Sequence, residues 1–579
     1  MRSAETLGGL LLEVAAEKPD SIAFGFLADG EDELVELTYA ELARQARRVA
    51  ALLADRLAPG GRAVLVYPPG LEFITAFFGC QLAGVVAVPA YPPAPPGMDA
   101  STLRLRRIAC DAGAEAVLTT TGYLAFRDAT PELASAVKVP WLVTDSRRSG
   151  DPGSCPVPGA DPGALAMLQY TSGSTADPKG VALRHANLMA NQRAIQRAMD
   201  SSDRTVGVSW LPMYHDMGLI GFVLHPLFLG IPSYLMSPVH FLERPARWLR
   251  AISRFRATIS GAPNFAYELC VKRITEPEEA GLDLSSWRTA FTGSEYVRAA
   301  PLRRFAERFA GRGMRASALY PCYGLAEASL LVTGSAPDAG LRTVLLDGQA
   351  LGHGTAAPSG ADHPRRVEVV SSGRPPEGHE VVIVGPEPEG PLPAGRVGEI
   401  WVRGPSVAGG YWNRPGETTS AFRATLPGRG PEQFLRTGDL GFLLDGELYV
   451  TGRAKEVMVV RGRNVYPQDV EVAAQQADSR ARAGCGAAFA IEADGAEEVA
   501  LVQEVSVSGD QELQEITRKI RQAVSEAQAL RLAAIVLVPP RTLPRTSSGK
   551  LKRMACRAEY LDGEISPLAE WRHMAAAEA

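Results

Sequence analysis

The sequence predicts an α/β protein with more than one domain. Short apolar runs alternate with amphipathic segments, which is the pattern of strands and helices packed in layers. The length of 579 residues also exceeds what one hydrophobic core usually holds. A third observation is a loop of glycine and hydroxyl residues at 171–180, between an apolar run at 164–168 and a helical pattern from Asn187 onward. Such a loop is suited to anion binding, so we expect an α/β enzyme with a phosphate site.

The N-terminal part supports this architecture element by element. Thr38-Tyr39-Ala40-Glu41 is a capping box, because Thr38 can accept from the backbone three residues on while Glu41 reaches back. The helix that it starts is expected to stop at Pro59-Gly60. A strand at 63–67, a helix at 71–82 and a strand at 85–88 should follow. We find no internal repeat.

Composition argues against several classes of protein. The formal net charge of −5 disfavours nucleic acid as the main partner. The seven cysteines are scattered without metal-ligand spacing, which favours reduced thiols in a cytoplasm. The apolar run 7–12 lies between two glutamates without a cleavage signature, so we expect no signal peptide. The uncharged stretch 73–98 is interpreted as a buried helix and strand. The stretch 217–241 holds His225, His240 and three prolines, so neither stretch is expected to span a membrane.

The loop 171–180 follows a Pro/Gly/Ser-rich connection at 145–161. Its glycines let backbone N–H groups approach an anion, its hydroxyls add donors, and Lys179 adds a point charge suited to phosphate. It is not a Walker A loop, because Gly-Lys-Ser/Thr at the required spacing is absent. The five residues 171–175 alone are equally consistent with a surface linker, so the assignment depends on the whole string and on the rest of the chain.

A series of strings, in the same order along the chain, resembles the motifs of the adenylate-forming superfamily, which holds acyl-CoA synthetases, peptide-synthetase adenylation domains and firefly luciferases. They are 171–180, 210–221, 260–270, 292–295, 320–327, 435–440, 452–456 and 544–550. The resemblance implies a large N-terminal adenylation domain of several α/β subdomains at 1–452 and a small mobile α+β domain at 456–579. The hinge would be 453–455, with Lys455 as its pivot.

The resemblance also implies a nucleotide site. Its binding residues would be Thr171, Ser172, Gly173, Ser174, Thr175, Lys179, Gly293, Ser294, Glu295, Tyr323, Gly324, Asp439 and Arg453. Tyr323 would flank the adenine, and Asp439 would accept from both ribose hydroxyls. Glu327 and Thr171 would hold Mg²⁺, for which oxygen ligands beside a triphosphate are suitable. Lys550 is the implied catalytic lysine, acting with Glu327 and its Mg²⁺ where charge builds on the α-phosphate of ATP.

The implied pocket for the carboxylate substrate comes from two strings. Its residues would be Trp210, Tyr214, His215, Asp216, Gly218, Asn264 and Phe265, with Asn264 and Phe265 facing an acyl chain. Considered alone, His215 is better explained as a hydrogen-bonded structural histidine than as a catalyst. In the superfamily, however, its string borders the substrate. Amino-acid adenylation domains usually carry an aspartate at this place, so an amino acid substrate is not expected.

Two features favour the fatty acyl-AMP ligase branch over the acyl-CoA synthetases. Ser372-Gly373-Arg374 begins much farther after Glu327 than is usual in acyl-CoA synthetases, so 334–370 resembles the insertion typical of fatty acyl-AMP ligases. The strings 88–93, 214–218 and 461–469 also resemble that branch, whereas Gly293-Ser294-Glu295-Tyr296 departs from its common Gly-Ala-Glu-Pro. The insertion has enough apolar residues to dock on the large domain and restrict the small one. The alternative is a floppy surface loop.

The expected activity is therefore ATP-dependent conversion of a fatty acid to acyl-AMP and pyrophosphate. The acyl group would then pass to the phosphopantetheine thiol of an acyl carrier protein acting in trans, in polyketide or lipopeptide biosynthesis. The segment 541–557 holds six basic residues and no acidic one, and the five around Lys550 (Arg541, Arg545, Lys552, Arg553 and Arg557) are expected to help recruit that carrier, although a solvated loop explains most of the run as well. A long-chain fatty acyl-CoA synthetase and an inactive adenylate-binding scaffold are the alternatives. Glu327, Asp439 and Lys550 argue against the scaffold.

Overall fold

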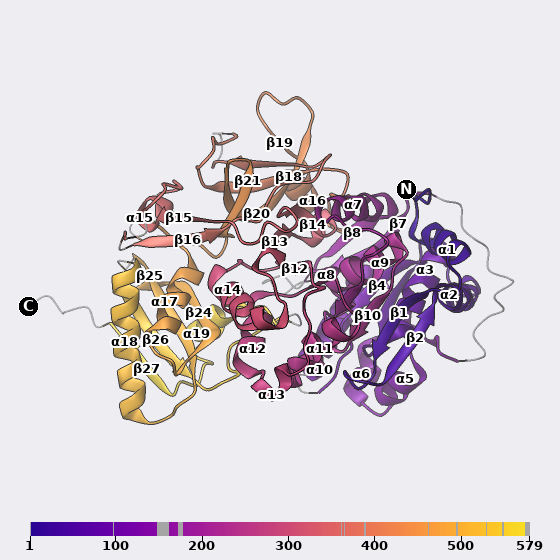
Figure 1. Ribbon diagram of the computed structural model, residues 1–579, viewed down its shortest axis with the longest axis horizontal. Helices are drawn as coiled ribbons and strands as arrows, with labels where there is room; N and C mark the ends of the chain where they lie inside the picture. Colours follow the sequence, from indigo (N-terminus) through magenta and orange to yellow (C-terminus); the bar gives the residue numbers. More distant parts are fainter. Residues whose placement is uncertain are drawn as a thin grey trace, which may run out of the picture.

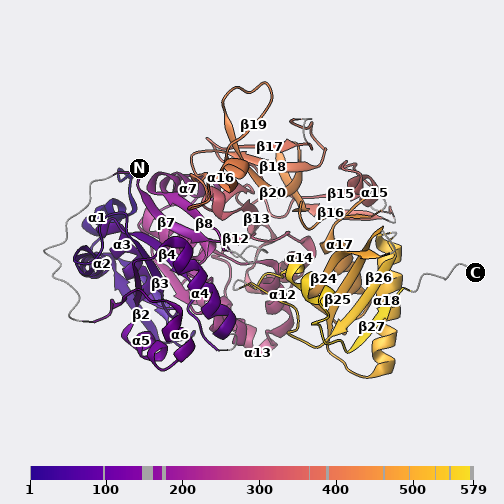
Figure 2. The ribbon, with the colours of Figure 1, turned by 180° about the vertical axis from the view of Figure 1, so that it is seen from behind.

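The computed structural model describes residues 2–95, 98–146, 161–171, 178–360, 362–363, 365–386, 390–460, 463–493, 496–528, 530–546 and 549–573. Figure 1 shows two sheets with their helices at one end of the long axis and a smaller C-terminal sheet at the other. A third unit of strands lies above the middle, and the opposite view in Figure 2 shows the same arrangement. The fold is thus a layered α/β architecture, as the sequence predicted.

The first sheet has six strands in the order β6-β5-β3-β4-β7-β8. They are β3 (Arg62–Val66), β4 (Val86–Ala90), β5 (Ala116–Thr119), β6 (Trp141–Val143), β7 (Leu165–Tyr170) and β8 (Gly180–Arg184). All neighbours are parallel except β7 and β8, whose antiparallel pairing brings the two ends of the 171–180 loop together. Its helices are α2 (Tyr39–Ala54), α3 (Leu71–Ala83), α4 (Met98–Ala112), α5 (Thr121–Asp128) and α6 (Pro131–Ala136).

The predicted N-terminal elements are confirmed. The capping box at Thr38 and Glu41 starts α2, which ends at Ala54, a little before Pro59-Gly60. The stretch 73–98 supplies α3, whose residues from Phe73 onward are all buried, and the buried strand β4. Among the described residues no helix is long and apolar enough to cross a membrane. Most of the connection 145–161 lies outside the described residues.

The second sheet has eight strands in the order β14-β13-β12-β11-β9-β10-β1-β2. They are β1 (Ile22–Leu27), β2 (Leu34–Thr38), β9 (Gly207–Ser209), β10 (Ser233–Met236), β11 (Ile259–Gly261), β12 (Thr289–Thr292), β13 (Leu319–Gly324) and β14 (Leu331–Gly334). Its centre is parallel, and only the edge strands β2 and β14 pair antiparallel. The carboxyl ends of β11, β12 and β13 therefore lie together, which is where parallel sheets place binding sites.

Many short helices connect these strands. They are α1 (Leu7–Glu17), α7 (His185–Ala198), α8 (Asp216–Leu219), the π-helical turn η2 (Ile220–Leu224), α9 (His225–Leu229), α10 (Pro238–Glu243), α11 (Ala246–Arg254), α12 (Asn264–Arg273), α13 (Glu276–Glu279), α14 (Ala299–Phe309), and the 3₁₀ turns η3 (Ala310–Arg312), η4 (Ala316–Ala318) and η5 (Ala326–Ala328). The stretch 217–241 is thus divided among three helices, a π turn and a strand. One continuous hydrophobic core joins this layer to the face of the first sheet through α3.

The third unit is a sheet ordered β17-β18-β20-β19, with β21 paired to β20. Its elements are β17 (Glu380–Val384), β18 (Gly398–Arg403), α16 (Pro415–Phe422), β19 (Ala424–Thr425), β20 (Gln433–Leu444) and β21 (Glu447–Arg453). The sequence also predicts a tight hairpin at Asp445-Gly446, and both residues adopt positive φ, 53° and 77°. Positive φ at both central residues matches the twist of the strands, so the predicted hairpin is confirmed.

The segment 334–370 folds into β15 (Thr343–Asp347), α15 (Gly348–Gly352) and β16 (Arg366–Val370), with β15 and β16 paired antiparallel. Its two ends meet, because Gly334 and Arg374 exchange backbone hydrogen bonds of 3.1 and 3.0 Å. Leu346, Leu351 and Val369 are buried in a cluster with Phe442 and Tyr449 of the β20–β21 hairpin. The described part of this segment is therefore docked, and a floppy surface loop is wrong for it.

The C-terminal part has its own core. Its elements are β22 (Met458–Val460), β23 (Arg463–Val465), α17 (Pro467–Ala477), β24 (Ala481–Ala493), β25 (Ala496–Val505), α18 (Asp510–Gln528), β26 (Leu532–Val538), α19 (Arg553–Leu561) and β27 (Ala569–Arg572). The sheet order is β24-β25-β26-β27. Two hydrophobic clusters hold it, and all their residues follow Glu456. A small domain that moves independently needs a core of its own. The separate core agrees with a boundary at 453–455, which stays a prediction.

Candidate active site

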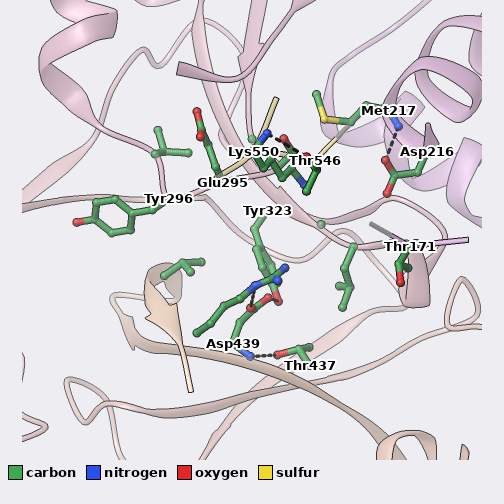
Figure 3. Close-up of a pocket in the computed structure, with 18 of the residues that line it drawn as sticks. Thr171, Asp216, Met217, Glu295, Tyr296, Tyr323, Thr437, Asp439, Thr546 and Lys550 are labelled. Carbon is green, nitrogen blue, oxygen red and sulfur yellow. Dashed lines mark hydrogen bonds and ion pairs between the residues drawn. The ribbon is translucent and has the colours of Figure 1, made fainter. Parts of the chain in front are cut away.

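The units meet around one cavity of about 800 Å³. Most of the described residues that the sequence predicts for the site line it: Thr171, Lys179, His215, Asp216, Phe265, Gly293, Ser294, Glu295, Tyr323, Gly324, Glu327, Asp439, Arg453, Lys455 and Lys550. These residues come from all three sheets and from the C-terminal unit. Figure 3 shows Tyr323 next to Asp439, and Lys550 beside Thr546 and Glu295.

Asp439, on β20, is the centre of a polar cluster at one end of this cavity. Its Oδ2 accepts a 2.7 Å hydrogen bond from the Tyr323 hydroxyl, and its Oδ1 lies 3.3 Å from Nε of Arg453. Its backbone N–H donates to Oγ1 of Thr437 at 3.1 Å. Burial raises the pKa of Asp439, while the charge of Arg453 opposes that rise. A carboxylate fixed in this way can accept hydrogen bonds from a pair of ligand hydroxyls.

Glu327 lies on the short turn η5, deep in the cavity wall. The Tyr411 hydroxyl donates to its Oε1 at 2.8 Å, and burial raises its pKa. Nζ of Lys179 lies 5.2 Å from the centre of the Tyr411 ring and pairs with Glu417. The described residues contain no group of three or more His, Cys, Asp or Glu that could hold a metal ion. Glu327 would therefore bind Mg²⁺ only together with phosphate oxygens and water, which is how Mg²⁺ usually binds.

The backbone around these residues is tightly constrained. Ser294 has φ of +69°, which is uncommon outside glycine, and a Cβ on Gly293 would lie 2.9 Å from the carbonyl oxygen of Cys322. Ser329 has φ +68° and ψ −71°, and Leu330 N–H donates to the carbonyl of Ala328 at 3.0 Å. That is the strained form of the γ-turn. Conformations of this kind cluster at functional sites, and neither serine is identified as strained by its sequence pattern.

Lys550 reaches the cavity from the C-terminal unit, after β26. Its backbone N–H donates to Oγ1 of Thr546 at 3.0 Å, and Thr546 N–H donates to the Lys550 carbonyl at 2.8 Å. Burial lowers the pKa of the Lys550 ammonium, an effect that the carboxylate of Asp216 opposes. The pKa of His215 falls to about 4, mainly through burial, so His215 is neutral at physiological pH. A desolvated cation thus lies beside a neutral imidazole.

Four of the predicted pocket residues support the wall without lining the cavity. Trp210 is buried in a stack with Phe241, and Tyr214 packs edge-on against Tyr91. Gly218 is required because a Cβ there would lie 2.1 Å from the Pro212 carbonyl.

Asn264 is also behind the wall. Its amide nitrogen donates to Oε1 of Glu295 at 2.9 Å and to the Tyr296 carbonyl at 2.8 Å, and its oxygen accepts from Arg298 N–H at 3.1 Å. The expectation that Asn264 faces an acyl chain is therefore corrected, since it holds the turn after β12.

The phosphate loop is only partly visible. Ser172, Gly173, Ser174 and Thr175 lie outside the described residues, so their role stays a prediction. Thr171 N–H donates to the Lys179 carbonyl at 3.2 Å, and the Thr171 carbonyl accepts from Nη2 of Arg104 at 3.1 Å. The two described ends of the loop are thus joined beside the cavity.

Three of the basic residues at 541–557, Arg545, Arg553 and Arg557, have specific partners. Arg553 pairs with Glu471 at 2.6 Å and with Glu456 at 2.7 Å. Nε of Arg557 donates to the Ala490 carbonyl at 2.7 Å, and Arg545 donates to the Gly549 carbonyl at 2.8 Å. Arg553 in particular stabilises the small unit internally, so it is a poor candidate for contact with a carrier protein.

The sequence motifs did not identify the apolar arm of the cavity. Its lining residues are Ile195, Met199, Gly221, His225, Ile259, Phe291, Leu330 and Leu331. Ile259 begins β11 and Phe291 lies near the carboxyl end of β12, and both stand just before the strings 260–270 and 292–295, so their position in the chain could have indicated them. In the sequence, His225 serves only as evidence against a membrane span.

Comparisons with known proteins bear on this geometry. The model of a family described as AMP-binding enzyme matches residues 11–412. The chain belongs to this family. It is 44% identical over 94% of its length to the medium-chain-fatty-acid–[acyl-carrier-protein] ligase JamA of Moorena producens, covering 93% of that protein. It is 37% identical to the long-chain-fatty-acid–AMP ligase FadD26 of Mycobacterium marinum, covering 96% of this chain and 97% of FadD26.

Solved structures agree with the family assignment. The fatty acyl-adenylate ligase of Legionella pneumophila, in complex with acyl adenylate and pyrophosphate, superposes with a TM-score of 0.76 at 38% identity, over 98% of both chains. This AMP-binding enzyme therefore has the mixed α/β fold of adenylate-forming enzymes, with a large N-terminal domain and a smaller C-terminal one.

Proposed function

We propose that this chain is a fatty acyl-AMP ligase that loads an acyl carrier protein. The observation that carries the proposal is that one cavity joins the Asp439–Tyr323 cluster, Lys550 and the apolar arm. A nucleotide at the polar end and a fatty acid in the arm would therefore meet beside Lys550. The printed names of the relatives, a fatty acid ligase of a carrier protein and fatty acid–AMP ligases, support this substrate class.

The first half-reaction is a displacement at phosphorus. A carboxylate oxygen of the fatty acid attacks the α-phosphorus of ATP, and the bond from that phosphorus to the bridging oxygen of the β-phosphate breaks. Acyl-AMP and pyrophosphate are the products. Asp439 would hold the ribose by accepting from its hydroxyls, Tyr323 would flank the adenine, and the backbone of Gly293–Glu295 would border the ring.

Lys550 would stabilise the charge that grows on the α-phosphate, since a desolvated ammonium is most effective where charge develops. Mg²⁺, when bound at Glu327, supplies charge neutralisation to the phosphates. Neutral His215 adds no charge beside the incoming carboxylate.

In the second half-reaction, the thiol sulfur of a phosphopantetheine arm attacks the acyl carbonyl carbon, AMP leaves, and the thiol proton passes to solvent or AMP. The thiol must reach the acyl carbonyl, and we expect Lys550 to occupy its path during adenylation. The small domain is therefore expected to turn about Lys455 before the second half-reaction. A docked 334–370 segment would restrain this motion. Coenzyme A would then be a poor acceptor, whereas a carrier protein held by its own surface contacts would succeed.

The test is an incubation of the protein with ATP, Mg²⁺ and a panel of fatty acids, with either coenzyme A or a holo-carrier protein, followed by mass analysis. We expect pyrophosphate and acyl-AMP with each acceptor, and thioester only on the carrier. Ready formation of acyl-CoA would return the chain to the acyl-CoA synthetases. Absence of pyrophosphate with every acid would leave only an adenylate-binding scaffold.

A further inference from the structure

The apolar arm contains one polar group that the proposed reaction does not use. His225, the first residue of α9, lines the arm and is only 2% exposed. Its Nδ1 lies 2.9 Å from Oε1 of Gln192, which is fully buried on α7. Its Nε2 has no hydrogen-bond partner in the part of the chain that the structure describes. A buried polar atom without a partner destabilises the protein, so this nitrogen needs an explanation.

The neighbours of His225 determine which of its nitrogens carries the proton. The amide nitrogen of Gln192 donates to the Ile220 carbonyl at 3.4 Å, so the amide oxygen faces the imidazole. Nδ1 of His225 must then be the N–H that donates to this oxygen. Burial lowers the pKa of His225 to about 3, so the ring carries no second proton at physiological pH. Nε2 is left as a hydrogen-bond acceptor with no donor bound to it among the described residues.

The local backbone holds the ring in this place. The Ile220 carbonyl also accepts from the backbone N–H of His225, which closes the π-helical turn η2. Such turns occur frequently at functional sites. The ring of Phe228 packs nearly parallel to the imidazole, with centroids 6.4 Å apart. The imidazole is therefore held through Nδ1, through its own backbone and against Phe228, and His225 is among the residues that line the cavity.

We propose that His225 selects an acyl chain that carries a hydroxyl group, by accepting a hydrogen bond from that hydroxyl at Nε2. This inference rests on the proposed function, because it assigns the substrate class of the same site. A keto oxygen has no proton to donate, so it would face the lone pair of Nε2. An ammonium group would need a counter-charge, and the arm around His225 is built from apolar residues such as Ile195, Ile259 and Leu331. A hydroxyl has a proton to donate and carries no charge, so it meets both requirements.

The experiment measures kcat/KM for pyrophosphate release with two matched series of acids, straight-chain alkanoic acids and ω-hydroxy acids of six to about fourteen carbons. At the chain length that brings the hydroxyl to Nε2, we expect the hydroxy acid to be favoured over the alkanoic acid of equal length by about tenfold. The matching ω-1 oxo acid should show no such advantage. At other lengths the hydroxy acid should be the poorer substrate, because its hydroxyl is buried without a partner.

Variants assign the preference to the imidazole. His225→Phe keeps a ring of similar shape and should abolish the advantage of the hydroxy acid. The double variant His225→Phe/Gln192→Leu removes both partners of the buried pair, so it covers the case in which the single variant is unstable. Met199→Leu changes the same wall without touching a polar group and should retain the hydroxy-to-alkanoic ratio. The melting temperature of each variant is the control for folding.

Two results would overturn the inference. One is a wild-type enzyme that releases pyrophosphate with alkanoic acids but prefers no hydroxy acid at any length, which would mean that a buried water satisfies Nε2. The other is a preference that survives in His225→Phe. Absence of pyrophosphate release with both series would instead overturn the proposed function, and the inference with it.

Discussion

The polar end and the apolar arm of the cavity are built in different ways. At the polar end, contiguous strings such as Tyr320–Glu327 and Leu435–Leu440 carry the lining residues, and charged groups hold one another in place. The arm is assembled from single residues on α7, η2, α9, β11, β12 and β14, and its lining is apolar except for His225. The residues of the polar end are thus specified by the reaction with ATP, which is the same for every acid. The residues of the arm are specified by the shape of the acyl chain. Changes at the polar end should alter the reaction of all acids alike, and changes in the arm should alter the choice among acids.

The largest effect should come from Lys550→Ala. Removal of one preorganised charge typically lowers a rate by about 10²–10³-fold, so acyl-AMP formation should nearly vanish with every acid tested. Transfer from preformed acyl-AMP to the carrier should fall much less, because the role proposed for the lysine is in the first half-reaction. Single-turnover rates of the two half-reactions measure this. Equal losses in both would mean that Lys550 has another role.

Asp439→Ala should raise the KM for ATP by about 10- to 100-fold, the usual value of hydrogen bonds to a charged group. The kcat should change little, since ribose contacts exist in both the ground and transition states. Tyr323→Phe, which removes only the 2.7 Å bond to Asp439, is the milder control. A tenfold fall in kcat with an unchanged KM for ATP would show that Asp439 does not bind ribose.

The pH dependence of adenylation should show a loss of rate at alkaline pH. Burial lowers the pKa of Lys550 below the ordinary lysine value of 10.5, so the ammonium loses its proton, and its charge, at a lower pH than an exposed lysine does. Lys550→Arg keeps a charge at all accessible pH values and should remove this alkaline limb, even if its rate is lower. A limb that persists in the arginine variant would belong to another group.

Weakening the contact between 334–370 and the small domain should raise the yield of acyl-CoA several-fold while adenylation continues. A Cβ on Gly352 would lie 2.7 Å from Cγ of Arg463, so Gly352→Val should push the two units apart without removing the cluster around Leu346. Replacing 334–370 by a short Gly/Ser linker is the larger version of this test. A variant that keeps full adenylation and still makes no acyl-CoA would show that coenzyme A is excluded elsewhere.

The smallest effect on the overall rate of adenylation, and the one that separates the two ends most cleanly, is expected from Gly221→Ala. The new Cβ would lie 3.8 Å from Leu330, so the arm accepts it and becomes shorter by about a methyl group. One methylene in a hydrophobic pocket changes discrimination by about 10–200-fold at most, so the preferred acid should shorten by one or two carbons. The KM for ATP should not change. If the preferred chain length and the KM for ATP change together, the two ends of the cavity are coupled.

The difference between the two ends also explains what could be predicted from the sequence. Asp439, Tyr323 and Glu327 were identifiable because their chemistry requires specific residue types within short strings. Ile195 and Leu331 were not, because many apolar residues could form the same wall, and the fold alone brings α7 and β14 together. The positive φ of Ser294 and Ser329 likewise depends on long-range packing. The strands and helices themselves were predictable where caps and turns are strong, as at Thr38 and Asp445-Gly446.

The pairing of Gly334 with Arg374 has a consequence for the history of the chain. Because the segment leaves and re-enters the fold at neighbouring points, its length can vary with little change in the entropy of closing the loop, and with no change to the strands on either side. The segment could therefore be inserted into a related fold as one unit. Grafted at the equivalent point of an enzyme that lacks it, it should fold on any β-hairpin that offers an apolar face like that of Phe442 and Tyr449. If the segment restrains the small domain as proposed, a change of acceptor would need a single insertion and no change to the residues at the polar end of the cavity.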